Sequence, residues 1–235
     1  MTKTNILFII IDSLRADKFY GSRGGPLTPN FTKLIKNGVY FEQAISSADA
    51  TLLSWAGIFA AKHPFKTGIR SSKFKKLNKN TQTYFDILKK AGYHFYSFLP
   101  PSGKVSGIFP KFENDDCYDV MPRFKMGLDE KIKNFLSTPK KQPWVCYVHS
   151  YNLHFPVLTP QGFEDKKFGI NNYEKQISLI DNSIGNILEL IDLKNTLFVL
   201  TSDHGAYFQT VISNGKKIDY ETKGDLQNLT LKMTN

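Results

Sequence analysis

The stretch Thr201-Ser202-Asp203-His204-Gly205, which follows the apolar run Leu197 to Leu200, says most about the fold of this chain. A short apolar run that ends in a carboxylate and an imidazole is typical of a buried strand with polar side chains at its carboxyl end. The run Asn5 to Ile11 has the same form and leads to Asp12. In an open α/β sheet, ligands bind beyond the carboxyl ends of the strands. The two runs therefore predict one shared site, and a divalent cation is the ligand that these side chains favour.

Strands and helices are expected to alternate along the chain, an order that predicts a mainly parallel or mixed central sheet with helices on both faces. Ile6 to Ile11 is rich in β-branched residues, which is typical of a parallel strand covered on both faces. Further strands are expected at Val39 to Ala44, Tyr93 to Phe98, Trp144 to His149 and Leu197 to Leu200. Helices are expected at Thr32 to Asn37, Thr51 to Ala61, Thr83 to Ala91, Leu128 to Leu136 and Tyr173 to Ile191. The sequence therefore predicts an α/β fold.

The length of 235 residues, of which 41% are hydrophobic, allows one α/β domain with a substantial core. No internal repeat or low-complexity tract divides the sequence, so residues 1–235 are predicted to form a single domain. The segment Pro100 to Arg123 gives no firm element. Beyond Gly205, Asn214 to Lys217 predicts a hairpin turn, and the polar tail to Asn235 has little periodicity.

The formal charge of +10 favours an anionic substrate or surface. The sequence has no arginine-rich block, and its aromatic residues fit a core, so nucleic-acid binding is not expected. Cys117 and Cys146 belong to no CxxC or Cys/His cluster, and we interpret them as ordinary thiols. The apolar stretch Ile6 to Ile11 is too short for a signal peptide or a membrane span, so we expect a cytoplasmic protein.

Five motifs follow one another in a recognisable order. They are Asn5 to Asp17, Thr28-Pro29-Asn30 with Gly38 to Phe41, Tyr147 to His149 with His154 to Pro156, Asp181 with Gly185, and Thr201 to Gly205. Over residues 5–208 this order resembles the sulfatase family of the alkaline-phosphatase-like superfamily. The resemblance implies that superfamily's fold, hydrolysis of sulfate or phosphate esters, and one divalent metal ion: Ca, Mn or Mg, with Zn as a further candidate. The family's lysine and histidine beyond Gly205 have no counterpart before Asn235, so the C-terminal part of the family fold is expected to be missing.

The nucleophile of the family lies at the start of a helix, and the resemblance places it on Thr51. Thr51, Leu53 and Trp55 stand at the fixed positions of the family's Cys/Ser-x-Pro-x-Arg signature. Because threonine cannot be converted to formylglycine, the resemblance implies an unmodified threonine, as in the phosphoglycerol and phosphoethanolamine transferases. A helix N-terminus suits this role, since its free N–H groups stabilise an alkoxide and anionic oxygens. Local sequence alone favours a helix N-cap for Thr51, and it is the resemblance that favours the nucleophile; Ser54 is the fallback nucleophile.

The resemblance also implies a metal-ligand set, which consists of Asp12, Thr51, Asp203 and His204. Asp12 has the alternative role of capping a helix. Ser13 stands where the family has a second Asp and is assigned to substrate binding together with His149 and His154. His154 is in addition the predicted general acid or oxyanion partner, although a lone histidine is often a structural residue.

Three hypotheses about function follow. The leading one is a metal-dependent hydrolase that cleaves an anionic sulfate or phosphate ester, linked to a glycan or a lipid, through a covalent Thr51 intermediate. The second is a transferase of phosphoethanolamine or phosphoglycerol. The third is a degenerate, non-catalytic domain that binds anions. The sequence leaves open the ester, the metal and the choice between hydrolysis and transfer.

Overall fold

The computed structural model of the chain describes residues 3–19, 25–71, 75–206, 209–213 and 216–220. The chain divides into two compact units, residues 1–205 and residues 206–235, and each is described by itself. The extent of the predicted domain over residues 1–235 stays a prediction.

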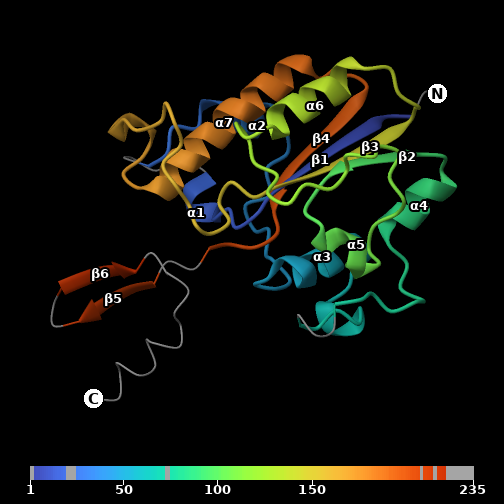
Figure 1. The fold of residues 1–235 in the computed structure, drawn as a ribbon, viewed down its shortest axis with the longest axis horizontal. Helices are drawn as coiled ribbons and strands as arrows, with labels where there is room; N and C mark the ends of the chain where they lie inside the picture. The colour runs from blue at the N-terminus through green and yellow to red at the C-terminus, as the bar shows by residue number, and fades with distance from the viewer. Residues whose placement is uncertain (1–2, 20–24, 72–74, 207–208, 214–215, 221–235) are drawn as a thin grey trace. The chain divides into compact units, whose positions relative to one another are not determined.

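The first unit is built on a four-stranded sheet with the strand order β2-β3-β1-β4, and all its neighbouring strands are parallel (Figure 1). Its strands are β1 (Asn5–Ile11), β2 (His94–Phe98), β3 (Trp144–Ser150) and β4 (Thr196–Ser202). Ile11 pairs with Ser150 on one side and with Ser202 on the other. Three strands therefore end at the same level, and the residues that follow them meet at one edge of the sheet. The predicted α/β fold with a parallel sheet is confirmed.

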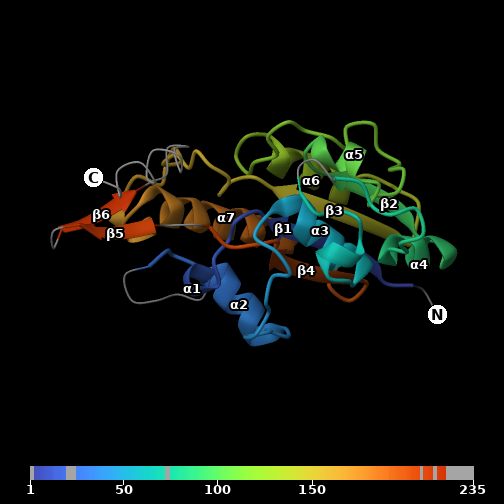
Figure 2. The ribbon, with the colours of Figure 1, turned by 90° about the horizontal axis from the view of Figure 1, so that it is seen from below.

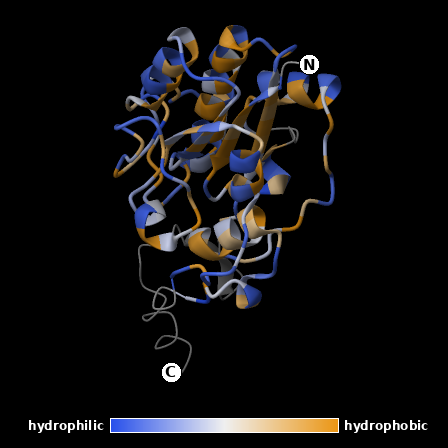
Figure 3. Ribbon diagram, turned by 90° about the vertical axis from the view of Figure 1, so that its right-hand side faces the viewer, coloured by the Kyte–Doolittle hydropathy of each residue, from blue (hydrophilic) through white to orange (hydrophobic). Residues whose placement is uncertain are grey.

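Helices cover both faces of this sheet (Figures 1 and 2). One face carries α1 (Ala16–Phe19), α2 (Pro29–Asn37), α6 (Leu128–Ser137) and α7 (Asn172–Leu190), and α7 contacts the other three. The other face carries α3 (Thr51–Ala60), α4 (Tyr84–Lys90) and α5 (Ser102–Ser106), and short 3-10 turns lie at Pro64–Lys66 and Lys166–Phe168. Because both faces are covered, the strands are mainly apolar, as Figure 3 shows.

The core next to α3 is aromatic. Trp55 and Phe59 of α3 are buried against Ile10 of β1 and Tyr147 of β3, and the rings of Phe59 and Tyr147 lie 5.1 Å apart, edge to face. Side chains of a strand alternate between its two faces, and Ile9, which points away from this cluster, is also fully buried. The core therefore fixes α3, and with it the position of Thr51, relative to the ends of β1 and β3.

The motif Thr28-Pro29-Asn30 contacts the motif around Asp181 and Gly185. The Asp181 carboxylate accepts hydrogen bonds from the backbone N–H of Asn30 (3.2 Å) and of Phe31 (2.7 Å), and so caps the start of α2 from α7. A Cβ atom on Gly185 would lie 2.6 Å from the Asn30 side chain, so only glycine allows this approach. Two motifs of the resemblance are thus halves of one packing contact, whose role in the fold is structural.

Replacing Asp181 by alanine is expected to lower the free energy of unfolding by about 1–3 kcal/mol, because the buried N–H groups of Asn30 and Phe31 lose their acceptor. Urea unfolding would measure the change. Glu189→Ala, an exposed position on the same helix, serves as the control and is expected to change the value by less than about 0.5 kcal/mol. Equal stability of the two variants would contradict the capping role.

The strand predicted at Val39 to Ala44 is wrong. Val39 and Phe41 are 82% and 74% exposed, and no described strand pairs with the segment. An apolar pattern favours a strand only where a neighbouring strand supplies hydrogen bonds and a face to cover. Within Pro100 to Arg123, for which no element was predicted, the structure forms the short helix α5.

The second unit contains a two-stranded antiparallel sheet made of β5 (Gln209–Ser213) and β6 (Lys216–Tyr220). Their pairing agrees with the hairpin predicted from Asn214 to Lys217. Asn214 and Gly215 themselves, and the tail to Asn235, lie outside the described residues.

Candidate functional site

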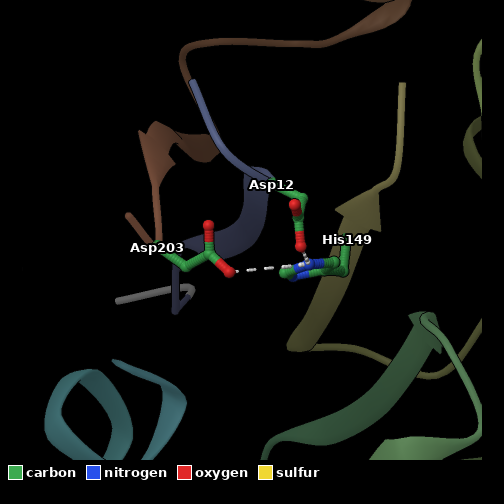
Figure 4. Close-up of side chains that lie close together, drawn as sticks. All are labelled: Asp12, His149 and Asp203. Atoms are coloured by element: carbon green, nitrogen blue, oxygen red, sulfur yellow. Dashed lines mark hydrogen bonds and ion pairs between the residues drawn. The ribbon is translucent and has the colours of Figure 1, made fainter. Parts of the chain in front are cut away.

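Residues from four separate segments meet at the carboxyl edge of the parallel sheet. Asp12 follows β1, His149 is near the end of β3, Asp203 follows β4, and Thr51 is the first residue of α3. Asp12, His149 and Asp203 are buried, and one ligand-capable atom from each lies within 4.8 Å of the other two (Figure 4). The structure thus brings together residues that are far apart in the sequence: Asp12 and Asp203 are separated by 191 positions.

Thr51 points its hydroxyl into this cluster. Its Oγ1 lies 3.1 Å from Oδ2 of Asp12 and 3.3 Å from Nε2 of His204. Its side chain remains partly exposed, and α3 has no side-chain cap at its N-terminus. The first N–H groups of a helix have no partner inside the helix. The hydroxyl therefore lies beside N–H groups that can receive the oxygens of an anion.

The two carboxylates differ in acidity. Burial has the largest effect on the pKa of Asp12 and would raise it, but the hydrogen bonds from His149 and Ser13 oppose it, and this pKa is lowered to about 2. At Asp203 burial outweighs the nearby histidines, and together with the charge of Asp12 it raises the pKa. A cation between the two carboxylates would favour the ionised form of both.

Asp203 also has an oxygen without a hydrogen-bond partner. Its Oδ1 accepts from the backbone N–H groups of Ser13 (3.2 Å) and His204 (2.8 Å), whereas its buried Oδ2 accepts from no described residue. The nearest ring nitrogens, of His204 and His149, lie 3.5 and 3.9 Å from Oδ2. An orphaned carboxylate oxygen inside a protein is unfavourable unless a cation balances it. This atom is the direct structural sign that the cluster fits a metal ion.

His204 directs an unshared electron pair of its ring toward the same oxygen, Oδ2 of Asp203. Its Nδ1 lies 2.8 Å from the carbonyl oxygen of Gly205, which can only accept, so Nδ1 carries the hydrogen. Its Nε2 is therefore unprotonated in the neutral ring and faces Oδ2 of Asp203. A cation bound between these two atoms, which are 3.5 Å apart, would receive both lone pairs. Carboxylates, an imidazole and a hydroxyl form a donor set that suits Mg, Mn, Ca or Zn.

Ser13, predicted as a substrate contact, lies against both carboxylates of the cluster. Its hydroxyl donates to Oδ1 of Asp12 (2.6 Å), its backbone N–H donates to Asp203, and the residue is 9% exposed. Ser13 adopts a left-handed conformation with φ of 62°, which turns the chain so that both contacts form. Ser13 therefore orients the two carboxylates, and its predicted contact with a substrate stays a prediction.

His154 lies outside the cluster. It is exposed in the loop after β3, its ring stacks on Tyr151 at 4.8 Å, and its Nδ1 donates to the carbonyl of Phe155. Among the described residues it forms no hydrogen bond or ion pair with Asp12, Thr51 or Asp203. Its predicted contact with a substrate stays a prediction. Ser54, the fallback nucleophile, is buried and donates to the carbonyl of Ala48, so it is not available for attack.

His149, which we assigned to substrate binding, is fully buried and contacts two residues to which the sequence analysis gave no functional role. Its Nδ1 lies 3.1 Å from the indole Nε1 of Trp55 and 2.9 Å from the hydroxyl oxygen of Tyr147. One sequence signal was available for Trp55. It follows Thr51 by four residues, and residues so spaced share one face of a helix. Tyr147 had a similar signal, since it precedes His149 by two residues in one predicted strand and residues so spaced share a face of the sheet.

Comparison with known proteins supports the resemblance. The sequence profile of the Sulfatase family matches residues 4–228. An ulvan-active sulfatase from Formosa agariphila is 25% identical over 93% of this chain and 48% of its own length. Two solved structures share the fold. The phosphonate monoester hydrolase of Agrobacterium radiobacter has a TM-score of 0.70 at 14% identity over 86% of this chain and 63% of that chain. A protein of the alkaline phosphatase superfamily from Vibrio parahaemolyticus has a TM-score of 0.59 at 20% identity over 90% and 58% of the two chains.

The chain spans about half the length of the curated sulfatase that it matches. Among the described residues no helix has the length and apolar character needed to cross a bilayer. The family profile covers nearly the whole chain, and the alkaline-phosphatase-like fold agrees with it. On this ground the chain belongs to the sulfatase family.

Proposed function

We propose that this chain carries the active site of a metal-dependent hydrolase of sulfate esters, with Thr51 as the nucleophile. The observation that carries the proposal is the position of the Thr51 hydroxyl. Its oxygen lies within 3.3 Å of both Asp12 and His204, at the end of the sheet where the orphaned oxygen of Asp203 is also found. A hydroxyl at a helix N-terminus beside a cation site is the arrangement that attack on an anionic ester requires.

Four residues would hold the metal ion: Asp12, Thr51, Asp203 and His204. When bound, the metal neutralises the developing alkoxide and the non-bridging oxygens of the ester. The orphaned oxygen of Asp203 and the free lone pair of His204 support this set, as does the raised pKa of Asp203, which a cation would reverse. The candidates remain Ca, Mn and Mg, with Zn as a further one.

In the proposed reaction, Oγ1 of Thr51 attacks the sulfur in line with the leaving group. A bond forms between Oγ1 and sulfur while the bond between sulfur and the ester oxygen breaks. The Thr51 proton has Oδ2 of Asp12 as an acceptor at 3.1 Å, and the departing alcohol takes a proton from His154 or from water. Water then attacks the sulfur of sulfo-Thr51, which releases sulfate and returns a proton to the threonine oxygen. The free N–H groups of α3 stabilise the sulfate oxygens in both steps.

The proposed substrate is a sulfate ester linked to a glycan. The support is the ulvan-active relative, together with the net charge of +10, which attracts polyanions. His154 lies on the exposed loop after β3, where a leaving sugar can reach it.

Removal of metal is expected to abolish turnover. After exhaustive chelation, the full chain should hydrolyse neither an aryl sulfate nor sulfated oligosaccharides, and one or more of Ca, Mn, Mg and Zn should restore the rate. Sulfate release would be measured for each metal, with a phosphodiester as the comparison substrate. Full turnover in the chelated protein would contradict the proposed role of the metal site.

Threonine in place of the family's Cys or Ser favours a second candidate, a transferase of phosphoethanolamine or phosphoglycerol. Such an enzyme forms a phospho-Thr51 adduct and passes it to an acceptor alcohol. Mass spectrometry of the peptide that contains Thr51, after incubation with a phospholipid or with a sulfate ester, distinguishes the two adducts. Metal binding without either adduct or turnover would instead support a non-catalytic, anion-binding domain.

A further inference from the structure

His149 lies between two carboxylates, and the ring nitrogen that carries its hydrogen decides whether it can bind a metal. We propose that Trp55 fixes His149 as the tautomer with the hydrogen on Nε2. His149 is then a hydrogen-bond donor to the carboxylate ligands and is not itself a ligand, and Trp55 is a positioning residue. The role in hydrolysis rests on the proposed function, whereas the tautomer rests only on the contacts of these side chains.

The indole of Trp55 points its N–H at Nδ1 of His149. The two nitrogens are 3.1 Å apart, and the rings meet at 90° with 4.9 Å between their centres. Both side chains are fully buried. An indole N–H can only donate a hydrogen bond. Nδ1 must therefore offer its lone pair to this contact.

Tyr147 does not reverse this assignment. Its hydroxyl oxygen lies 2.9 Å from the same Nδ1 and can act as donor or acceptor. If Nδ1 carried a hydrogen, Tyr147 could accept it, but the buried N–H of Trp55 would face that hydrogen and have no other acceptor among the described residues. If Nδ1 is unprotonated, both neighbours can donate to it. Buried donors without a partner are rare in folded proteins, so the contacts favour unprotonated Nδ1.

The hydrogen of the neutral ring then lies on Nε2. This nitrogen is 3.3 Å from Oδ2 of Asp12 and 3.9 Å from Oδ2 of Asp203, on the side shown in Figure 4. It therefore donates to Asp12. A ring nitrogen that carries a hydrogen has no lone pair for a metal. Asp12, His149 and Asp203 are close enough to resemble a three-ligand site. Of these three residues, only the two carboxylates are ligands, and His149 orients one of them.

The two histidines of the site thus have opposite tautomers. Gly205 holds the hydrogen of His204 on Nδ1 and leaves its Nε2 free, whereas Trp55 holds the hydrogen of His149 on Nε2. One imidazole is a ligand and the other is a donor. Backbone geometry sets the first role, and a side chain on the nucleophile helix sets the second.

The tautomer can be observed directly in the ¹⁵N-labelled full chain by long-range ¹H–¹⁵N correlation of the imidazole rings. The five histidines are distinguished by comparison with His149→Gln. We expect the ring of His149 to show a protonated Nε2 and an unprotonated Nδ1, both in the metal-free protein and after addition of Zn²⁺. In Trp55→Phe, which removes the N–H and keeps an aromatic ring, the pattern should shift toward protonated Nδ1. Trp144→Phe, at the other tryptophan, should leave it unchanged.

Metal affinity gives an independent readout. His149→Gln places an amide N–H near the position of Nε2 and should bind Mn²⁺ within about threefold of the unaltered protein, whereas His149→Ala should bind about tenfold more weakly. Trp55→Phe should weaken binding in the unaltered background and have no effect in the His149→Gln background, because the amide needs no indole to fix its hydrogen. Calorimetric titration would measure these four variants and the unaltered protein.

Two results would overturn the proposal. One is a protonated Nδ1 on His149 in the metal-free protein. The other is loss of the Nε2 hydrogen on addition of Zn²⁺, together with metal affinity of His149→Gln as low as that of His204→Ala. If instead the tautomer is as proposed and no ester is hydrolysed, the proposed function fails while this inference stands.

Discussion

Replacing Thr51 by alanine is expected to lower kcat/KM for sulfate ester hydrolysis by at least about 10³-fold, since removal of a nucleophile leaves only binding and electrostatic contributions. The Thr51 hydroxyl lies 3.1 Å from Asp12 and is the only described hydroxyl that contacts both Asp12 and His204. Thr51→Ser should keep much of the activity, because it keeps an oxygen at the same place. Steady-state sulfate release, with mass spectrometry of the peptide that contains Thr51, would measure both effects.

Ser54 provides the matched control on the same helix. Its hydroxyl is buried and donates to the carbonyl of Ala48. Ser54→Ala is therefore expected to turn over substrate within about tenfold of the unaltered protein, since no reacting group is lost. Turnover that is unchanged in Thr51→Ala, or abolished only in Ser54→Ala, would exclude Thr51 as the nucleophile.

Asp203→Asn is expected to have the second large effect. It should lower the affinity for metal, and it should raise the stability of the metal-free protein. The amide keeps an oxygen for the N–H groups of Ser13 and His204 but removes the charge that a cation requires. Metal affinity should fall at least about 100-fold. The metal-free protein should become more stable, because burial and the charge of Asp12 raise the pKa of Asp203, so its ionised form opposes folding at neutral pH.

The stability change is expected to raise the midpoint of thermal unfolding by about 2–4 °C for each kcal/mol gained. Calorimetric titration with Mn²⁺ would measure the metal affinity. Thermal unfolding in the presence of a chelator would measure the stability of the metal-free protein. Asp115→Asn, at an exposed position in the turn before Cys117, is the control and should change neither value. Unaltered metal affinity in Asp203→Asn would remove Asp203 from the ligand set.

The sequence determined which residues reach the edge of the sheet. Asp12 and Asp203 follow apolar runs, and parallel strands that pair in register end at the same edge. Their meeting was therefore predictable from the sequence, although their distance was not. The start of α3 at Thr51 was predictable as well, since a helical segment begins there and ends before His63-Pro64.

Other expectations needed information that local sequence lacks. The strand at Val39 to Ala44 had a suitable composition but no described partner strand. Ser13 stands at the family's second Asp position, and only the structure shows that its left-handed backbone turns its donors onto the two carboxylates. In both cases the outcome depended on which distant segment lies next to the residue, and no spacing along the chain encodes that.

The sequence by itself determined the fold class, the family and the set of side chains that collect at the strand ends, because hydrophobic periodicity and strand-end motifs are local properties. Only the tertiary structure decided which of those histidines donates a hydrogen bond and which is a ligand. His149 and His204 have the same chemistry, but Trp55 lies against one ring and the carbonyl of Gly205 against the other. Each neighbour fixes where the hydrogen of its imidazole lies, and that position makes one histidine a donor and the other a ligand.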